Sequence, residues 1–187
     1  FTSATPGNVS YTVTATNPQG CSTNDQVTIR VDARPVANAG QDDSICRGEA
    51  IRIGAPQSAG ITYQWTPATD LSDAAAADPI ATPRSTTTYQ VIASNSLGCA
   101  DTSSVTIVVN PVPPATIIAA ADTICAGASI QLQVAAGARY RWSPSGGLSS
   151  DTIANPLASP LATTTYQVVA TNSFGCTDTF TFNPGIT

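Results

Sequence analysis

Five cysteines carry the clearest chemistry in this 187-residue chain, and they occur in two sequence contexts. Cys46 and Cys125 follow isoleucine, in SICRGEAI and TICAGASI, whereas Cys21, Cys99 and Cys176 follow glycine. Recurring thiols of this kind predict disulfides, which persist in oxidising, extracytoplasmic compartments. The chain has no CxxC motif and no histidine, so a reactive or metal-binding thiol is the weaker interpretation.

The economical pairing joins one cysteine of each context within one sequence repeat. It gives Cys46–Cys99 and Cys125–Cys176, each closing a loop of about 50 residues and contributing roughly 4 kcal/mol in the chain-entropy model. Cys21 corresponds to Cys99 and Cys176, so we expect its partner upstream of Phe1. A bridge from Cys21 to Cys46 would require a different division into domains.

The residue combinations of common enzymes are missing from the sequence. Without histidine or lysine there is no Ser-His-Asp triad, no imidazole metal site and no Schiff base. Glu49 is the only glutamate, and nothing in the sequence suggests a cleft in which it would face a second acid. The sequence therefore predicts that this chain is not an enzyme.

Aspartates gather in two places that could offer oxygen ligands to Ca²⁺. They are Asp42 and Asp43 near the start of one repeat, and Asp70, Asp73 and Asp78 in a later loop. The other copy of the repeat has Gly147 and Ser150 in place of Asp70 and Asp73. We therefore favour solvated turns over a calcium site and expect no cofactor.

The net charge of −5 and the content of only seven cationic residues, all arginine, provide no basic stripe for a nucleic acid. No apolar run approaches the roughly 20 residues that span a bilayer, so membrane insertion is not expected. The chain begins at Phe1 rather than at an initiator methionine. We expect it to be a processed or excerpted piece of a longer protein.

The elements that position these residues are repeated along the chain. The segment that starts at Trp65 aligns without a gap on the segment that starts at Trp142, and the opening residues match the second half of the same repeat. A period of about 77 residues predicts a tandem array of one domain type. We expect the end of a truncated repeat at 1–33 and full repeats at 34–111 and 112–187.

Each repeat has the composition of an all-β domain, because β-branched residues favour strands and proline interrupts helices. About seven short strands separated by Gly, Pro, Asn and Asp turns predict an antiparallel, immunoglobulin-like (Ig-like) β-sandwich. Trp65 and Trp142 are expected in the cores. Tyr89 and Tyr166, each after a TTT run, are expected at the tyrosine-corner position. The proline-rich linkers predict extended, semi-rigid connections.

The motifs I-C-x-G, Y-x-W-x-P, T-T-Y-x-V and G-C-x-D recur in one order. This order resembles the PKD/Ig-like repeats of giant surface proteins that gliding bacteria export by type IX secretion. The resemblance covers essentially the whole chain. It implies an extracellular sandwich array at the cell surface, in an adhesin-like or filamentous protein, and it implies no activity.

Three tripeptides look like the O-glycan acceptor pattern of that bacterial group. They would carry glycans on Ser44, Thr123 and Thr152. The alternative is that each is simply a polar residue entering a strand.

Three functions are open from the sequence. The leading one is a stalk or spacer segment of an adhesin or appendage. Its expected partners are neighbouring repeats, further chains of a filament, and a cell-surface or glycan target that other domains of the protein would bind. The second is a glycan- or protein-binding module, for which Phe174 is the one aromatic residue expected at an exposed hairpin tip. The third is an accessory array of a secreted hydrolase.

Residues 1–33 supply only two strands, which upstream strands or a neighbouring chain would complete.

Overall fold

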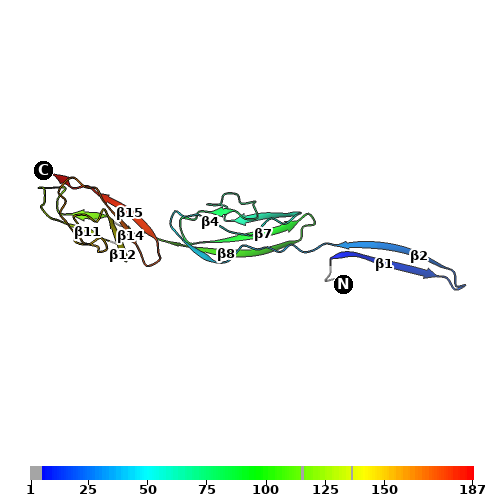
Figure 1. Cartoon of the computed structure of the whole chain (residues 1–187). Coiled ribbons are helices and arrows are strands. Elements are labelled where there is room, and N and C mark those ends of the chain that lie inside the picture. The colour runs from blue at the N-terminus through cyan, green and yellow to red at the C-terminus, as the bar shows by residue number, and fades with distance from the viewer. Residues whose placement is uncertain (1–5, 115, 136) are drawn as a thin grey trace.

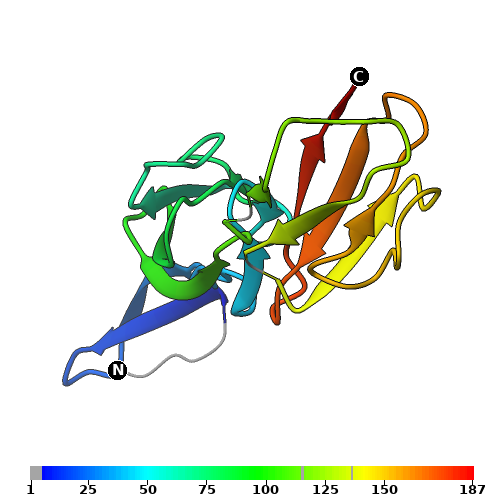
Figure 2. The same cartoon turned by 90° about the vertical axis from the view of Figure 1, so that its left-hand side faces the viewer.

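The computed structural model describes residues 6–114, 116–135 and 137–187, and within these ranges the chain is all-β. A two-stranded hairpin and two β-sandwiches follow one another end to end, with the C-terminus at the end farthest from the hairpin (Figure 1). Viewed after a 90° turn, the three parts are displaced from one another sideways (Figure 2). None of the described residues forms a helix long and apolar enough to cross a membrane.

The hairpin consists of β1 (Gly7–Thr16) and β2 (Ser22–Val31), paired antiparallel over their whole length. Its apolar side chains are exposed: Tyr11, Val13, Val27 and Ile29 range from 46% to 64% accessible. In the sandwich that follows, the residues at the same repeat positions are all buried; these are Tyr89, Val91, Val105 and Ile107. The hairpin therefore presents the core face of a sandwich without the opposing sheet.

The first sandwich contains six strands. They are β3 (Asp43–Cys46), β4 (Ile51–Arg52), β5 (Ile61–Thr66), β6 (Ile80–Ala81), β7 (Thr87–Asn95) and β8 (Ala100–Asn110). The larger sheet has the order β3-β8-β7-β5, and β4 pairs with β6 in the smaller one. All pairs are antiparallel except β3 with β8, which run parallel with Cys46 opposite Asn110.

The second sandwich repeats this plan with strands of two to six residues. They are β9 (Ile117–Ala119), β10 (Thr123–Ile124), β11 (Ile130–Val134), β12 (Arg139–Ser143), β13 (Leu157–Ala158), β14 (Tyr166–Thr171), β15 (Thr177–Phe182) and β16 (Gly185–Ile186). The sheets have the orders β12-β14-β15 and β13-β11-β9. Pro184, which has no N–H to donate, separates β15 from β16, and β16 pairs parallel with β10 as β8 does with β3.

Each sandwich has its own core. The first is formed by residues between 37 and 109 around Trp65 and Tyr89, and the second by residues between 117 and 182 around Trp142 and Tyr166. All four aromatic residues are at most 2% exposed. The predicted all-β sandwich fold is thus confirmed, with one core per full sandwich.

Candidate functional site

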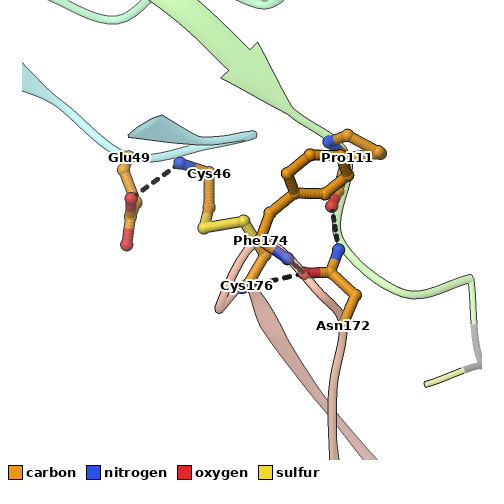
Figure 3. The surroundings of a disulfide bond; sticks show 6 residues. All are labelled: Cys46, Glu49, Pro111, Asn172, Phe174 and Cys176. Atoms are coloured by element: carbon orange, nitrogen blue, oxygen red, sulfur yellow. Dashed lines mark hydrogen bonds between the residues drawn. A yellow bond between two sulfur atoms is a disulfide. The ribbon is translucent and has the colours of Figure 1, made fainter. Parts of the chain in front are cut away.

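A disulfide joins the two sandwiches. Cys46, at the end of β3, is bonded to Cys176, just before β15, with 5.6 Å between their Cα atoms and a sequence separation of 130 (Figure 3). Cys176 is only 1% exposed. The predicted pairings Cys46–Cys99 and Cys125–Cys176 are therefore wrong in this structure, because the bridge crosses from one unit to the next.

The parallel pairing of β3 with β8 explains why Cys46 cannot reach Cys99. Cys46 lies opposite Asn110, the last residue of β8, whereas Cys99 immediately precedes Ala100, the first residue of that strand. At about 3.4 Å per residue, the 11 residues of β8 separate the two thiols by roughly 35 Å. A disulfide requires Cα atoms within about 7 Å.

The same separation holds in the second sandwich. Cys125 follows β10, and the N–H of the next residue, Ala126, donates to the carbonyl oxygen of Thr187 at 3.3 Å. Cys176 lies at the other end of the unit, at the start of β15. Cys125 is thus a free, exposed thiol, as are Cys21 and Cys99 among the described residues.

Asn172 provides a second connection at this joint, by which we mean Cys46, Asn110–Pro114 and the turn Asn172–Cys176. Its side-chain Nδ2 donates to the carbonyl oxygen of Pro111 at 2.6 Å. Its Oδ1 accepts the N–H groups of Phe174 and Cys176, both at 3.0 Å. One side chain therefore shapes the turn that carries Cys176 and fastens that turn to the linker (Figure 3).

The side of the joint that belongs to the first sandwich is ordered by local hydrogen bonds. The N–H of Cys46 donates to Glu49 Oε2 at 2.8 Å, and the N–H of Glu49 donates to the carbonyl oxygen of Cys46 at 3.0 Å. The N–H of Arg47 donates to the carbonyl oxygen of Asn110 at 2.9 Å. Glu49, the only glutamate, therefore serves the turn after β3.

Sequence reasoning missed the role of Asn172, although a signal was present. An asparagine precedes each glycine-linked cysteine by four residues, in NPQGC, NSLGC and NSFGC. Asn17 and Asn95 accept hydrogen bonds from their own turns just as Asn172 does. The spacing therefore marked a repeated turn built around one amide side chain.

Asp101 anchors the linker that enters the first sandwich. Its carboxylate accepts the N–H of Ala37 at 3.0 Å and lies 3.5 Å from the guanidinium of Arg34. The Ala37 N–H has the largest influence and lowers the pKa of this carboxyl below its ordinary value. Burial opposes that shift, while the Thr102 N–H and the Arg34 charge add to it.

Of the five aspartates considered for calcium, Asp42, Asp43, Asp73 and Asp78 are engaged in local contacts. Asp42 accepts the N–H of Thr106 at 2.7 Å, Asp73 accepts the N–H of Ala75 at 2.8 Å, and Asp78 pairs with Arg52 at 2.8 Å. Across the described ranges, no group of three or more His, Cys, Asp or Glu side chains is placed to hold a metal ion.

The two tryptophans are core anchors rather than exposed platforms for a glycan. The indole N–H of Trp65 donates to the carbonyl oxygen of Ala76, and that of Trp142 to the carbonyl oxygen of Ile153, both at 2.9 Å. Phe174 differs from them because it is 62% exposed and belongs to the turn at the joint.

The two core tyrosines have different hydroxyl environments. Tyr166 donates to the carbonyl oxygen of Gly146 at 3.1 Å, whereas the buried Tyr89 hydroxyl has no hydrogen-bond partner among the described residues. Burial raises the pKa of both phenols, and the charge of Asp70 raises that of Tyr89 further. Asp70 occupies the position of Gly147, where any Cβ would lie 2.9 Å from the Tyr166 hydroxyl. The corner of the first sandwich therefore carries a side chain at a position where the second sandwich has none.

The proposed O-glycan acceptors are accessible. Ser44 lies in β3, Thr123 in β10 and Thr152 in a loop, and all three are exposed. Glycosylation at these positions remains a prediction.

The family model and one solved structure agree with this fold. Residues 33–111 match the family model described as "Ig-like domain CHU_C associated". The eight N-terminal Ig domains of Down syndrome cell adhesion molecule (DSCAM) align with 97% of this chain at 13% identity and a TM-score of 0.56, and the chain spans 27% of that structure. A three-Ig fragment of titin aligns with 96% of this chain at 14% identity, over 75% of its own length, with a TM-score of 0.46. No curated protein sequence matches.

Together these findings define an all-β chain of Ig-like sandwiches. More particularly, residues 33–111 are similar to the CHU_C-associated Ig-like family, while the likeness to DSCAM shows the fold alone.

Proposed function

We propose that this chain is a structural segment of a large extracellular adhesin or filamentous surface appendage, in which it acts as a stalk or spacer. The observation that carries the proposal is the disulfide between consecutive sandwiches. A bridge inside one unit would stabilise that unit alone. A bridge between units instead fixes how they follow one another, which is what a spacer requires.

The joint supports a stiff connection because two covalent routes cross it side by side. One is the linker that leaves β8 at Asn110, and the other is the bridge that leaves β3 at Cys46, directly opposite. A single linker permits rotation about its bonds, whereas two parallel attachments oppose it. Pro111, Pro113 and Pro114 further restrict the linker.

The surroundings of the protein follow from the same features. An Ig-like chain that contains a disulfide belongs to an oxidising compartment, which supports an extracellular or secreted location. The CHU_C-associated family match and the recurring motifs support export by type IX secretion and a place at the cell surface. Ig-like domains typically serve structure and binding, so the proposed role requires no catalysis.

Small-angle X-ray scattering of the oxidised 187-residue chain tests the spacer. A compact protein of this length has a radius of gyration of about 16 Å. Three units in line, each roughly 35–40 Å long by the length of β8, form a rod whose radius of gyration is about 30 Å or more. The proposal predicts the radius of gyration of the rod, and a radius of gyration close to that of the compact protein would refute it.

A second candidate is a binding module, which is favoured by the exposure of Phe174 at the joint. An exposed aromatic ring in a turn can stack against a sugar or an apolar side chain. Phe174→Ala should then abolish binding on a glycan array. Leu97→Ala is the matched control, because Leu97 occupies the same place in the preceding turn and is also 62% exposed. Equal binding by all three proteins would exclude this candidate.

A further inference from the structure

We propose that Cys125 and Cys99 each take part in a further joint of the same kind as the Cys46–Cys176 joint. Each would form a disulfide with the complementary cysteine of another unit of this repeat. The isoleucine-linked cysteine of one unit would bond to the glycine-linked cysteine of the next, throughout an array. The partner is thus a domain of the same kind as residues 34–111. This inference rests on the observed bridge and stands independently of the spacer role.

The backbone around Cys125 makes the same hydrogen bonds as the backbone around Cys46. In each case the N–H of the next residue donates to a carbonyl oxygen at the end of the parallel partner strand: Arg47 to Asn110, the last residue of β8, at 2.9 Å, and Ala126 to Thr187, the residue after β16, at 3.3 Å. The N–H three residues after each cysteine then donates to that cysteine's carbonyl oxygen, at 3.0 and 2.9 Å. The second sandwich therefore presents the Cys125 thiol at its distal end, as the first presents Cys46.

Cys99 lies in the same turn as Cys176. Asn95 Oδ1 accepts the N–H groups of Leu97 and Cys99 at 3.1 and 3.0 Å, as Asn172 does in the next unit. Asn95 Nδ2 also donates to the carbonyl oxygen of Ala33, at 3.5 Å, just as Asn172 Nδ2 donates to that of Pro111. The contact between turn and linker therefore also exists where the chain enters the first sandwich. Cys99 is free and exposed at that place.

The difference in exposure between the two turns follows from their bonding. Cys176 is 1% exposed and bonded to Cys46, whereas Cys99 is exposed and free. The two turns have the same hydrogen bonds. They differ in that the isoleucine-linked cysteine of the preceding unit is bonded at the second turn and not at the first. Docking of that unit would bury Cys99 as well.

Formation of each bridge has a simple chemical balance. Two thiols lose two protons and two electrons to form one sulfur–sulfur bond, and a small-molecule disulfide accepts both and leaves as two thiols. A thiolate first displaces one half of that disulfide, and the thiolate of the neighbouring unit then displaces the other half.

This pairing would have a mechanical consequence. With both joints closed, tension enters the first sandwich at its linker and at Cys99, and leaves at Cys46 and Asn110. The covalent routes are residues 34–46 and 99–110, the second of which is almost entirely the extended strand β8. Residues 47–98, which include β4 to β7, lie off the load path. The array would therefore resist stretching even when its cores are strained.

One more unit added to the full chain tests the pairing. A copy of residues 111–187 fused after Thr187 continues the repeat in register, because Thr187 occupies the place of Asn110. In that copy the isoleucine-linked cysteine is changed to serine, and Thr177→Ser marks the peptide that carries its glycine-linked cysteine. After oxidation with glutathione disulfide, proteolysis without reductant and mass spectrometry should find Cys125 bonded to the marked peptide and Cys46 to the unmarked one.

Thiol titration provides the second readout and the control. Free thiols should fall from three in the original chain to two in the extended chain. They should remain at three when the original unit of the extended chain also carries Cys125→Ser. The proposal would be overturned if Cys125 remained free while Cys46–Cys176 formed in the same sample, or if Cys125 bonded to the unmarked peptide.

Cross-linking between unmodified chains tests the same rule without an added unit. At high concentration with glutathione disulfide, Cys125 of one chain should bond to the glycine-linked Cys21 of another, which lies between β1 and β2 in the N-terminal hairpin (Figure 1). Heterotypic Cys125–Cys21 peptides should exceed homotypic Cys125–Cys125 peptides at least tenfold. Equal yields would show that the two contexts do not recognise each other.

Discussion

Cys46 lies directly opposite Asn110, at the end of the first sandwich from which the chain departs for the second. This one register between parallel strands places a thiol beside the linker rather than beside the last hairpin of its own unit. The disulfide of the chain therefore connects domains. The proposed role as a spacer depends on that relationship.

Removal of Cys46 or Cys176 should have the same effect, whereas removal of Cys99 should have none. The bridged cysteines are 130 positions apart in sequence, and a loop of that size is worth at most about 5 kcal/mol in the chain-entropy model. Cys46→Ser and Cys176→Ser should lower the urea midpoint of unfolding equally, and Cys99→Ser should leave it unchanged. Equal losses for Cys46→Ser and Cys99→Ser would instead indicate a bridge within the unit.

The two core tyrosines should respond differently to loss of the hydroxyl group. Tyr166→Phe removes the hydrogen bond to Gly146 and should destabilise the second sandwich by about 1 kcal/mol. Tyr89→Phe removes a buried hydroxyl that has no described partner, so the first sandwich should be equally or more stable. Urea unfolding of both variants measures the difference, and a larger loss for Tyr89→Phe would contradict the structure.

Asp70 should be replaceable by glycine with a gain in stability. Its φ of 63° lies in the left-handed region that glycine favours, and the matching position in the second sandwich is Gly147, with φ of 77°. Asp70→Gly should stabilise the first sandwich by about 1 kcal/mol, as judged by thermal unfolding.

Gly147→Ala provides the matched comparison for that variant. It places a Cβ 2.9 Å from the Tyr166 hydroxyl and 3.2 Å from the carbonyl oxygen of Ser159, at a positive φ. The second sandwich should lose stability. A gain from Gly147→Ala would contradict the account of this corner.

The entry linker should detach at low pH. The folded pKa of Asp101 lies below its ordinary value of 3.8, chiefly because its carboxylate accepts the Ala37 N–H. Its contribution to stability is therefore fully present above that ordinary value, and it is lost as the pH falls through the lower folded pKa. Hydrogen exchange of the Ala37 amide should accelerate, relative to other amides, over that acidic range. Asp101→Asn should remove this pH dependence, and an unchanged profile would refute the role of the carboxylate.

Local pattern was enough to predict the fold class and the core. Strands were recognisable because apolar residues alternate with polar ones over a few positions, as at Tyr63 and Trp65 and in the run that contains Tyr89. Trp65 and Tyr89 are buried in the structure, as expected. Repetition of the pattern placed Trp142 and Tyr166 in the same way.

The disulfide could not be predicted in this way because it depends on a non-local register. The segment that contains Cys46 is readable as a short strand, but nothing in it shows that the strand runs parallel to β8, which comes much later in the chain. The economical choice of a partner within the repeat followed sequence distance. Strand direction determined the outcome, because it placed Cys46 and Cys99 at opposite ends of one sandwich.

Single-molecule stretching of the whole chain from its two ends tests the connection between units most directly. With the Cys46–Cys176 bridge intact, only residues 1–46 and 176–187 can be extended, which is roughly 200 Å at about 3.5 Å per residue. The reduced chain should reach roughly 650 Å. Bridges confined to single units would give about 300 Å in the oxidised state. We predict the shortest of these three lengths for the oxidised chain, and either of the longer two would contradict a covalent joint between the sandwiches.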